Sequence, residues 1–456
     1  MKQRLKVGYY KLSRVSRKIR GNSLINRYGI KGKTDFNIII LTIECCRNDY
    51  LEDGDNALIS ALPMNKAAYF ANCYSSSSWT LPSISSIVTS LYPSQHLARL
   101  VEEPRNFDEK KVANLIKYSV RDDVLSISEI LENSQGYLTY LDSGGLLFAE
   151  IPVRGRYKLV KANYPTDFSI QVDFLIRLLD NNNYRTFAHI HVINSHEPLM
   201  LPEKLLAQIN EADYSDEVRK WSYREGKDLN SKEFISYKAR KVSLYKLVLR
   251  YVFAEIVRLY DLLSQAGLAD NTIIVITGDH GEEFWDHVEL EKRYFYDPRG
   301  FYGVGHGHNM FNEITCVPLI LFGPGIRPGV YTHPVSHVDI VPTILDLLGL
   351  EYDDLMFEGV NLFQKDEERV IIVEDIAYGY DKLAIIQGDV KYLIAPWDKV
   401  FWKFDLSKDP HENSPETLEV DEIKGMCSFV KFRSKISPIL DKNTALGSLF
   451  KRYFVR

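Results

Sequence analysis

Two side chains that commonly bind metals stand next to each other in the second half of the sequence. Asp279 and His280 follow residues 271–277, a β-branched run typical of a buried strand, after the single residue Gly278. Such a pair on its own serves equally well as a turn and cap. A second acid, Glu44, follows a similar run at residues 37–43. Acids at the ends of two core strands that are distant in sequence are hard to explain as structure, and they indicate a divalent-metal site.

Hydroxyl groups are concentrated just before a predicted helix, in the segment 75–84. A hydroxyl in this position can point at a metal-bound oxyanion, while the helix N-terminus adds backbone N–H donors and partial positive charge. That geometry suits an activated nucleophile, and Thr80 is the candidate. The alternative is that Ser78 or Thr80 only caps the helix, with Pro82 in its first turn. These residues alone favour neither interpretation.

Four short apolar runs predict the strands that would position these groups, and a periodic stretch at 243–266 predicts a helix before one of them. A helix, a short turn and a strand make one half of a βαβ unit. Open parallel sheets bind ligands outside the carboxyl ends of their strands, so we expect three of the four strand-end turns to converge on one crevice. The four runs are 37–43, 186–192, 271–277 and 316–322.

Two pairs of polar residues have structural explanations instead. His337 and Asp339 open an apolar helix, so capping and packing account for them. His189 and His191 alternate along the predicted strand 186–192, and we expect them to satisfy local hydrogen bonds.

The length of 456 residues and the hydrophobic content of 45% allow one large α/β domain with a smaller appendage, or two ordinary domains. We place a catalytic domain at 36–355, after a basic arm at 1–35. Within the domain, the charged and aromatic segment 203–241 lacks a clean period and predicts an inserted flap. Residues 356–456 begin with hairpin-like strands and predict a small antiparallel subdomain with a tail.

The net charge excludes some partners. It is -5, from 56 basic and 61 acidic residues, so no global basic field exists to hold nucleic acid or an anionic membrane. Five irregularly spaced cysteines indicate no disulfide framework and favour a reducing compartment. With no signal peptide or membrane-spanning run in view, we expect a cytoplasmic protein. Its basic N-terminus offers peripheral membrane association as the alternative to a solvated arm.

Five segments together resemble the sulfatase branch of the alkaline phosphatase superfamily, in the order in which they occur there. The resemblance covers residues 36–350 discontinuously, and 402–410 resembles a late hairpin of that family. It implies an α/β, alkaline-phosphatase-like sandwich with a large, mostly parallel central sheet flanked by helices, plus a small C-terminal antiparallel subdomain. The five segments are NIIILTIE, WTLPSISSIVTSLYPSQH, GLADNTIIVITGDHGEEF, GHGHNMFNEITCVPLILFGPG and SHVDIVPTILDLLGL.

The resemblance also implies a metal site. Family members bind metal through a strand-end acid, the nucleophile and a later Asp with His or Asn, which correspond here to Glu44, Thr80, Asp279 and His280. A two-metal site would need a further Asp-x-x-x-His pair, which is absent near His196, so we expect a single ion. Three oxygen ligands and one imidazole favour Mn or Zn, with Mg and Ca as alternatives.

The nucleophile motif departs from the sulfatase form, which is Cys or Ser, any residue, Pro, any residue, Arg. Residues 80–84 read Thr-Leu-Pro-Ser-Ile, without the residue that becomes formylglycine and without the Arg. An unmodified Thr80 resembles instead the phosphodiesterases and the phosphoglycerol or phosphoethanolamine transferases of the superfamily. Glu44, in place of the usual Asp, points the same way. The resemblance therefore implies attack on phosphorus and a covalent phospho-threonine.

Three histidines complete the implied site. His196 resembles the family's His-x-Pro turn, whose imidazole contacts substrate or protonates the leaving oxygen. His306 and His308 precede the strand 316–322, where relatives carry a His or Lys that binds the transferring group, and His306 fits that place better. We expect His196 and His306 to act in catalysis, and all three histidines to contact substrate.

The leading hypothesis is a metal-dependent hydrolase or transferase of phosphate esters, whose substrate is a small molecule, a lipid head group or a glycan ester. Two alternatives stay open. One is a sulfatase with an unusual nucleophile, and the other is a non-catalytic binding protein that has kept the fold. The intact set of metal ligands speaks against the second alternative, because a decaying site should lose its ligands first.

Overall fold

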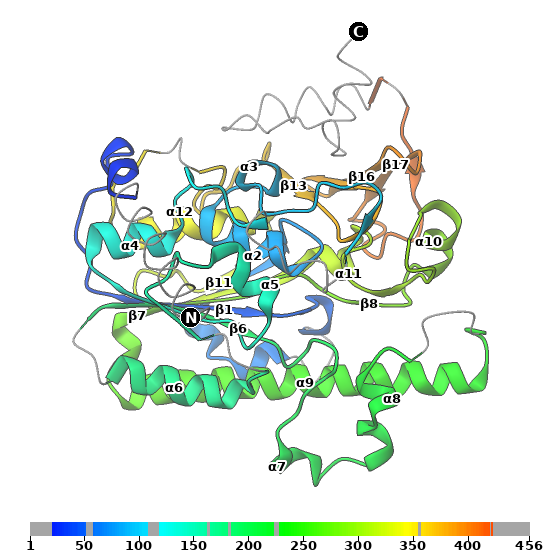
Figure 1. Ribbon diagram of the computed structural model, residues 1–456, viewed down its shortest axis with the longest axis horizontal. Coiled ribbons are helices and arrows are strands. Elements are labelled where there is room, and N and C mark those ends of the chain that lie inside the picture. The colour runs from blue at the N-terminus through cyan, green and yellow to red at the C-terminus, as the bar shows by residue number, and fades with distance from the viewer. Residues whose placement is uncertain are drawn as a thin grey trace, which may run out of the picture.

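A nine-stranded, mostly parallel sheet runs through the centre of the protein in the computed structural model (Figure 1). Its strands are β1 (Asn37–Ile43), β2 (Ala67–Tyr74), β4 (Leu138–Asp142), β5 (Leu159–Lys161), β6 (Thr186–Val192), β7 (Thr272–Gly278), β10 (Cys316–Phe322), β11 (Gly329–Tyr331) and β12 (Val335–Ser336). Their order is β11-β2-β10-β7-β1-β6-β4-β5, and β12 pairs with β2 outside this path. The structure describes residues 21–51, 58–107, 118–161, 165–180, 184–222, 228–353, 357–419 and 421–422.

Helices cover both faces of this sheet (Figure 1). They are α6 (Phe168–Asp180) and α9 (Lys232–Gln265) on one face, and α2 (Thr80–Thr89), α4 (Ile127–Gln135) and α12 (Ile340–Leu347) on the other. Along β1, Ile39 and Leu41 pack toward the first layer, while Ile38 and Ile40 pack toward the second. A strand that is apolar on both faces is expected where helices bury both sides of a sheet. The predicted architecture is confirmed.

The directions of the strands decide which turns meet. β1 runs parallel to β6 and β7, so the carboxyl ends of all three lie at one edge of the sheet. β10 runs antiparallel to β7, and the turn that follows it, at Gly323, lies at the opposite edge against Thr272. β2 is antiparallel to β10, and Tyr74 at its end pairs with Cys316. The turns after β1, β6 and β7 therefore meet, and the segment after β2 joins them.

A separate sheet near the C-terminus has the order β13-β15-β16-β17-β18, and every neighbouring pair in it is antiparallel. Its strands are β13 (Val370–Glu374), β15 (Leu383–Gln387), β16 (Val390–Ala395), β17 (Val400–Asp405) and β18 (Glu416–Thr417). The predicted small antiparallel subdomain is thereby confirmed. The predicted tail beyond residue 422 lies outside the described residues.

Short elements connect these parts. The helices are α3 (Pro93–His96), α5 (Leu147–Glu150), α7 (Glu203–Leu206), α8 (Asp216–Arg219), α10 (Val288–Tyr294) and α11 (Asn312–Thr315). The strands are β3 (Arg105–Asn106) with β14 (Tyr378–Gly379), and β8 (Glu283–Phe284) with β9 (Val304–Gly305).

The longest helix, α9, begins earlier than the predicted stretch 243–266. Its first residue is Lys232, and the side chain of the N-cap serine accepts the N–H of Phe234 at 3.1 Å. The predicted flap 203–241 therefore contains α7, α8 and the first turns of α9. Aromatic residues such as Tyr237 are buried in those turns, and the charged residues between them hid the helical period.

The part of the predicted N-terminal arm that the structure describes packs onto the domain. Ile25 and Ile30 are buried in the same apolar cluster as α12. Residues 1–20 lie outside the described residues. Among the helices that the structure describes, none is long and apolar enough to cross a membrane.

Candidate active site

The turns after β1 and β7 bring two acids and an imidazole together at one edge of the sheet. Ile43 pairs with Gly278 across these parallel strands, so Glu44 and Asp279 follow at the same height. The Nε2 atom of His280 lies 3.2 Å from Glu44 Oε1 and 3.4 Å from Asp279 Oδ2. All three side chains are fully buried. The structure therefore places these acids and the imidazole within contact distance of one another.

Thr80, the first residue of α2, joins this group. Its Oγ1 donates to Glu44 Oε1 at 2.9 Å and lies 3.2 Å from His280 Nε2. The N-cap residue of α2 is Trp79, whose side chain makes no capping hydrogen bond. The Thr80 hydroxyl thus points at the acid instead of capping its own helix. The N-terminus of α2, with its partial positive charge, lies beside the same group.

The loop before Thr80 is held by Asp375, the residue that follows β13. The hydroxyls of Ser77 and Ser78 donate to the Asp375 carbonyl oxygen at 2.9 and 3.3 Å. Trp79 Nε1 donates to the Asp375 carboxylate at 3.0 Å. Asp375 itself adopts a left-handed backbone, with φ of 76°. Three consecutive residues of the loop that precedes Thr80 are therefore fixed from the C-terminal subdomain.

One oxygen of Asp279 is buried without a hydrogen-bond partner among the residues that the structure describes. Its Oδ1 accepts the backbone N–H groups of Cys45 and His280, at 3.2 and 2.9 Å, but its Oδ2 accepts none. Burial, together with the charge of Glu44, raises the pKa of Asp279 to about 7. Burial would also raise the pKa of Glu44, but hydrogen bonds from His191 and His280 hold that pKa well below its usual range. An orphaned buried oxygen beside an ionised carboxylate is a fitting place for a divalent cation.

The imidazole of His280 is also suited to a metal. Its Nδ1 donates to the carbonyl oxygen of Gly281 at 2.8 Å, so the neutral ring carries its lone pair on Nε2. Burial disfavours a charged ring, yet Asp279 and Glu44 raise the pKa of His280 to about 9, so the pocket strongly favours positive charge. Two carboxylates, a hydroxyl and an imidazole nitrogen suit Mn or Zn. We call Glu44, Thr80, Asp279 and His280 the Thr80 site.

Two further histidines lie next to the Thr80 site. The ring of His306 is 4.3 Å from that of His280 and 5.8 Å from that of His196, measured between centroids. His306 Nδ1 lies 3.0 Å from Glu282 Oε1, and His196 Nδ1 lies 2.6 Å from the carbonyl oxygen of Glu197. When each Nδ1 donates to its oxygen, the Nε2 atoms of both rings are left available for a substrate.

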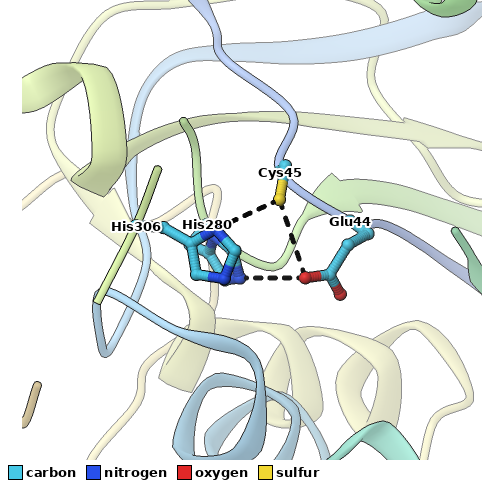
Figure 2. A group of neighbouring side chains, drawn as sticks. All are labelled: Glu44, Cys45, His280 and His306. Carbon is cyan, nitrogen blue, oxygen red and sulfur yellow. Dashed lines mark hydrogen bonds and ion pairs between the residues drawn. The ribbon is translucent and has the colours of Figure 1, made fainter. Parts of the chain in front are cut away.

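Glu282 and Cys45 belong to this neighbourhood although their spacing gave no sign of it. Cys45 Sγ lies 3.4 Å from His306 Nδ1 and 3.7 Å from Glu44 Oε1, as Figure 2 shows. Burial and the nearby acids raise the pKa of the Cys45 thiol well above its usual range. Adjacency to Glu44 and to Asp279-His280-Gly281 is the one sequence signal that would have found these two residues.

His308 lies in a different group of side chains. Its Nε2 is 3.2 Å from Glu283 Oε2 and 3.1 Å from Glu291 Oε1, and the Asn309 side-chain amide donates to both carboxylates. We call these four residues the Glu283 cluster. Of the three histidines expected at the substrate, the structure thus brings His196 and His306, and not His308, beside the Thr80 site.

The chain resembles known proteins in sequence and in structure. The family described as Sulfatase matches residues 37–350, more than half of the chain. Choline-sulfatase of Rhizobium meliloti (strain 1021) is 30% identical over 170 residues, which cover 36% of this chain and 30% of that protein. Lipoteichoic acid synthase 1 of Bacillus subtilis (strain 168) is 26% identical over 185 residues, which cover 41% of this chain and 24% of that protein. The aligned segments thus span less than a third of either relative.

A solved structure, the phosphonate monoester hydrolase of Agrobacterium radiobacter, has the same fold. It superposes with a TM-score of 0.63 at 15% identity, over 92% of this chain and 96% of that chain. The family match includes every residue of the Thr80 site, both neighbouring histidines and the strands of the central sheet that position them. The chain belongs to the sulfatase family.

Proposed function

We propose that this protein is a metal-dependent hydrolase or transferase of phosphate esters, in which Thr80 is the nucleophile. The observation that carries the proposal is the Thr80 hydroxyl, which lies 2.9 Å from Glu44 Oε1 at the N-terminus of a buried helix. Threonine cannot become the formylglycine of a sulfatase. Ile84 also stands where the sulfatase motif has its Arg.

Glu44, Thr80, Asp279 and His280 would hold one divalent ion, with Mn or Zn favoured over Mg or Ca. When bound, such an ion lowers the pKa of a coordinated hydroxyl and neutralises charge on the transferring group. The orphaned Oδ2 of Asp279 supports this assignment. Removing the ion should therefore abolish activity.

The side chains of the site suit a two-step transfer. In the first step the Thr80 hydroxyl gives its proton to solvent water, its oxygen forms a bond to phosphorus, and the bond from phosphorus to the leaving oxygen breaks. The leaving alkoxide takes a proton from Nε2 of a protonated His196 or His306, and that imidazole becomes neutral. In the second step water or an acceptor alcohol attacks the phospho-threonine and gives its proton to the neutral imidazole, while the bond from phosphorus to Thr80 Oγ1 breaks and Thr80 takes up a proton from solvent.

The relatives support two related chemistries. The likeness to lipoteichoic acid synthase 1 favours transfer of a phosphate-containing group, on a small molecule, a lipid head group or a glycan. The likeness to choline-sulfatase keeps sulfate esters as the second candidate. Thr80 favours the first, because an unmodified hydroxyl has to be the attacking group.

The test uses two nitrophenyl esters, a sulfate and a phosphodiester, each with metal-stripped protein and with added Mn²⁺. We expect metal-dependent turnover of the phosphodiester, and intact-protein mass spectrometry should find the transferred group on Thr80. Metal-dependent turnover of the sulfate alone would overturn the choice of phosphate. A purified protein that holds no stoichiometric divalent ion, and whose activity is the same in Thr80→Ala, would overturn the enzyme assignment.

A further inference from the structure

A line of hydrogen bonds crosses the buried core and ends on Glu44. The hydroxyl of Tyr157 lies 3.0 Å from His189 Nδ1, and His189 Nε2 lies 3.1 Å from Thr42 Oγ1. Thr42 Oγ1 lies 2.9 Å from His191 Nδ1, and His191 Nε2 lies 2.6 Å from Glu44 Oε2. Five side chains from three segments of the chain are therefore connected without a break.

The two central strands place these groups in a row. Thr42 of β1 pairs with His191 of β6, and His189 stands two residues earlier on the same strand. Residues at i and i+2 of a strand point to the same face, so both imidazoles flank the threonine. Every member of the line except Tyr157 is fully buried, and Tyr157 is 2% exposed. Buried polar groups persist where each is satisfied by a partner, and here the partners are one another.

One set of proton positions satisfies the whole line with both rings neutral. Glu44 is an ionised acceptor, so His191 carries its proton on Nε2 and accepts on Nδ1. Thr42 then donates to His191 and accepts from Nε2–H of His189. His189 accepts on Nδ1 from the Tyr157 hydroxyl. Burial lowers the pKa of His189 to about 3, in agreement with a neutral ring.

We propose that this line positions Glu44, with His191, Thr42 and His189 as positioning residues that hold Oε2 and leave Oε1 to Thr80 and the metal. The inference rests on the proposed metal site. Residues that hydrogen-bond to a metal ligand and orient it typically change the metal affinity by about 10- to 100-fold when they are lost. Thr42 touches no ligand of the Thr80 site among its hydrogen bonds in the described residues, so its loss acts through His191.

The first test measures Mn²⁺ affinity of metal-stripped protein by isothermal titration calorimetry. Thr42→Val removes the hydroxyl at nearly constant shape, and Thr139→Val is the matched control, because Thr139 is a buried threonine of the neighbouring strand β4 outside the line. We expect about 10- to 100-fold weaker binding in Thr42→Val and wild-type binding in Thr139→Val. Equal affinities in the two folded variants would overturn the proposal.

The second test needs no variant and no metal. Long-range ¹H–¹⁵N correlation spectra of the metal-free wild-type protein report which ring nitrogen of each histidine carries the proton. We expect the Nε2–H tautomer at both His189 and His191. An Nδ1–H tautomer at either residue would contradict the proposed line of hydrogen bonds. If the wild type binds no Mn²⁺ while both tautomers are as expected, then the proposed metal site is wrong and the proposed hydrogen-bond line is not.

Discussion

Two buried groups of carboxylates and histidine lie close together in this protein, and their oxygens differ. In the Thr80 site, Glu44 Oε1, Thr80 Oγ1 and His280 Nε2 lie within 3.2 Å of one another. In the Glu283 cluster, ligand atoms of Glu283, Glu291 and His308 lie within 4.8 Å of one another. In the Glu283 cluster, however, the carboxylates also accept backbone N–H groups, from His287 to Glu283 and from Gly303 to Glu291. In the Thr80 site, Asp279 Oδ2 has no hydrogen-bond partner among the described residues, although His280 Nε2 lies 3.4 Å away.

Residue types alone do not distinguish the two groups as metal sites, but the hydrogen bonding of their oxygens does. The Glu283 cluster supplies its own cation, because Glu291 and Glu283 outweigh burial and raise the pKa of His308 to about 10. Its carboxylate oxygens are satisfied by protein donors. The Thr80 site also draws a proton onto His280, but one oxygen stays unsatisfied and a hydroxyl points inward. An unsatisfied carboxylate oxygen, and not the count of acids, distinguishes the Thr80 site as a place for an ion.

The largest effect should come from the nucleophile. Thr80→Ala removes the attacking oxygen, so we expect the turnover rate with a nitrophenyl phosphodiester to fall at least about a thousandfold. Thr89→Ala is the control, because Thr89 ends the same helix and its hydroxyl only donates to the Ser85 carbonyl oxygen at 2.7 Å. Comparable turnover in Thr80→Ala and Thr89→Ala would contradict the catalytic role of the Thr80 hydroxyl, and the Thr80 site would then be no more catalytic than the Glu283 cluster.

Metal content should separate the two groups directly. Asp279→Asn removes a charged ligand, and we expect Mn²⁺ affinity to fall at least about a hundredfold. Glu283→Gln alters a carboxylate of the Glu283 cluster and should leave Mn²⁺ affinity unchanged. Calorimetric titration of both variants measures this. If Glu283→Gln loses Mn²⁺ binding and Asp279→Asn keeps it, then the metal binds at the Glu283 cluster and not at the Thr80 site.

The Glu283 cluster should instead affect how the free energy of unfolding depends on pH. The pKa of His308 rises from 6.5 to about 10 on folding, so between these values the folded state holds a proton that the unfolded state has lost. Its stabilising contribution is complete below pH 6.5 and is lost as pH rises toward 10. We expect the free energy of unfolding of the wild type to exceed that of His308→Gln by about 3 kcal/mol at pH 6, and by much less at pH 10.

Urea denaturation in the presence of a chelator measures this difference, since bound metal would otherwise add its own pH dependence. A gap between wild type and His308→Gln that stays constant from pH 6 to pH 10 would mean that His308 is uncharged in the folded protein.

The smallest expected effect concerns the residue next to the Glu283 cluster. Glu282 contacts His306 at 3.0 Å, while Glu283 faces His308, so neighbouring acids serve the two groups separately. Glu282→Gln keeps an acceptor for His306 but removes its charge, and we expect turnover to fall about tenfold. Glu283→Gln should change turnover by less than about twofold. Steady-state kinetics with one substrate compares the two.

The sequence predicted the strands and the core of the Thr80 site because both depend on local pattern. Apolar runs end at Glu44 and Asp279, and parallel pairing forces such ends to meet. The family resemblance favoured His306 over His308 but still placed both at the substrate, because the local pattern does not show that Gly307, with φ of 76°, makes a left-handed turn that redirects the chain between them. That turn depends on packing against residues far away in the sequence.

His191 shows a different limit. Its alternation with His189 on a buried strand correctly indicates hydrogen-bonded side chains, but periodicity does not name the partner. The partner is Glu44, 147 positions earlier in the sequence, and only the sheet order β1-β6 brings the two together. Cys45 is hidden for a similar reason, because its left-handed backbone, with φ of 56°, turns its thiol toward His306.

The Asp375 contact also sets an order of events during synthesis. All the ligands of the Thr80 site and both neighbouring histidines precede β13, so a ribosome has made every reacting group before it makes the residue that holds Trp79. That residue lies 296 positions after Trp79. A nascent or truncated chain that stops before β13 therefore carries all the groups of the Thr80 site, but Ser77, Ser78 and Trp79 lack the partner that Asp375 gives them. Under the proposed function, we expect activity to begin only when the C-terminal subdomain has been added.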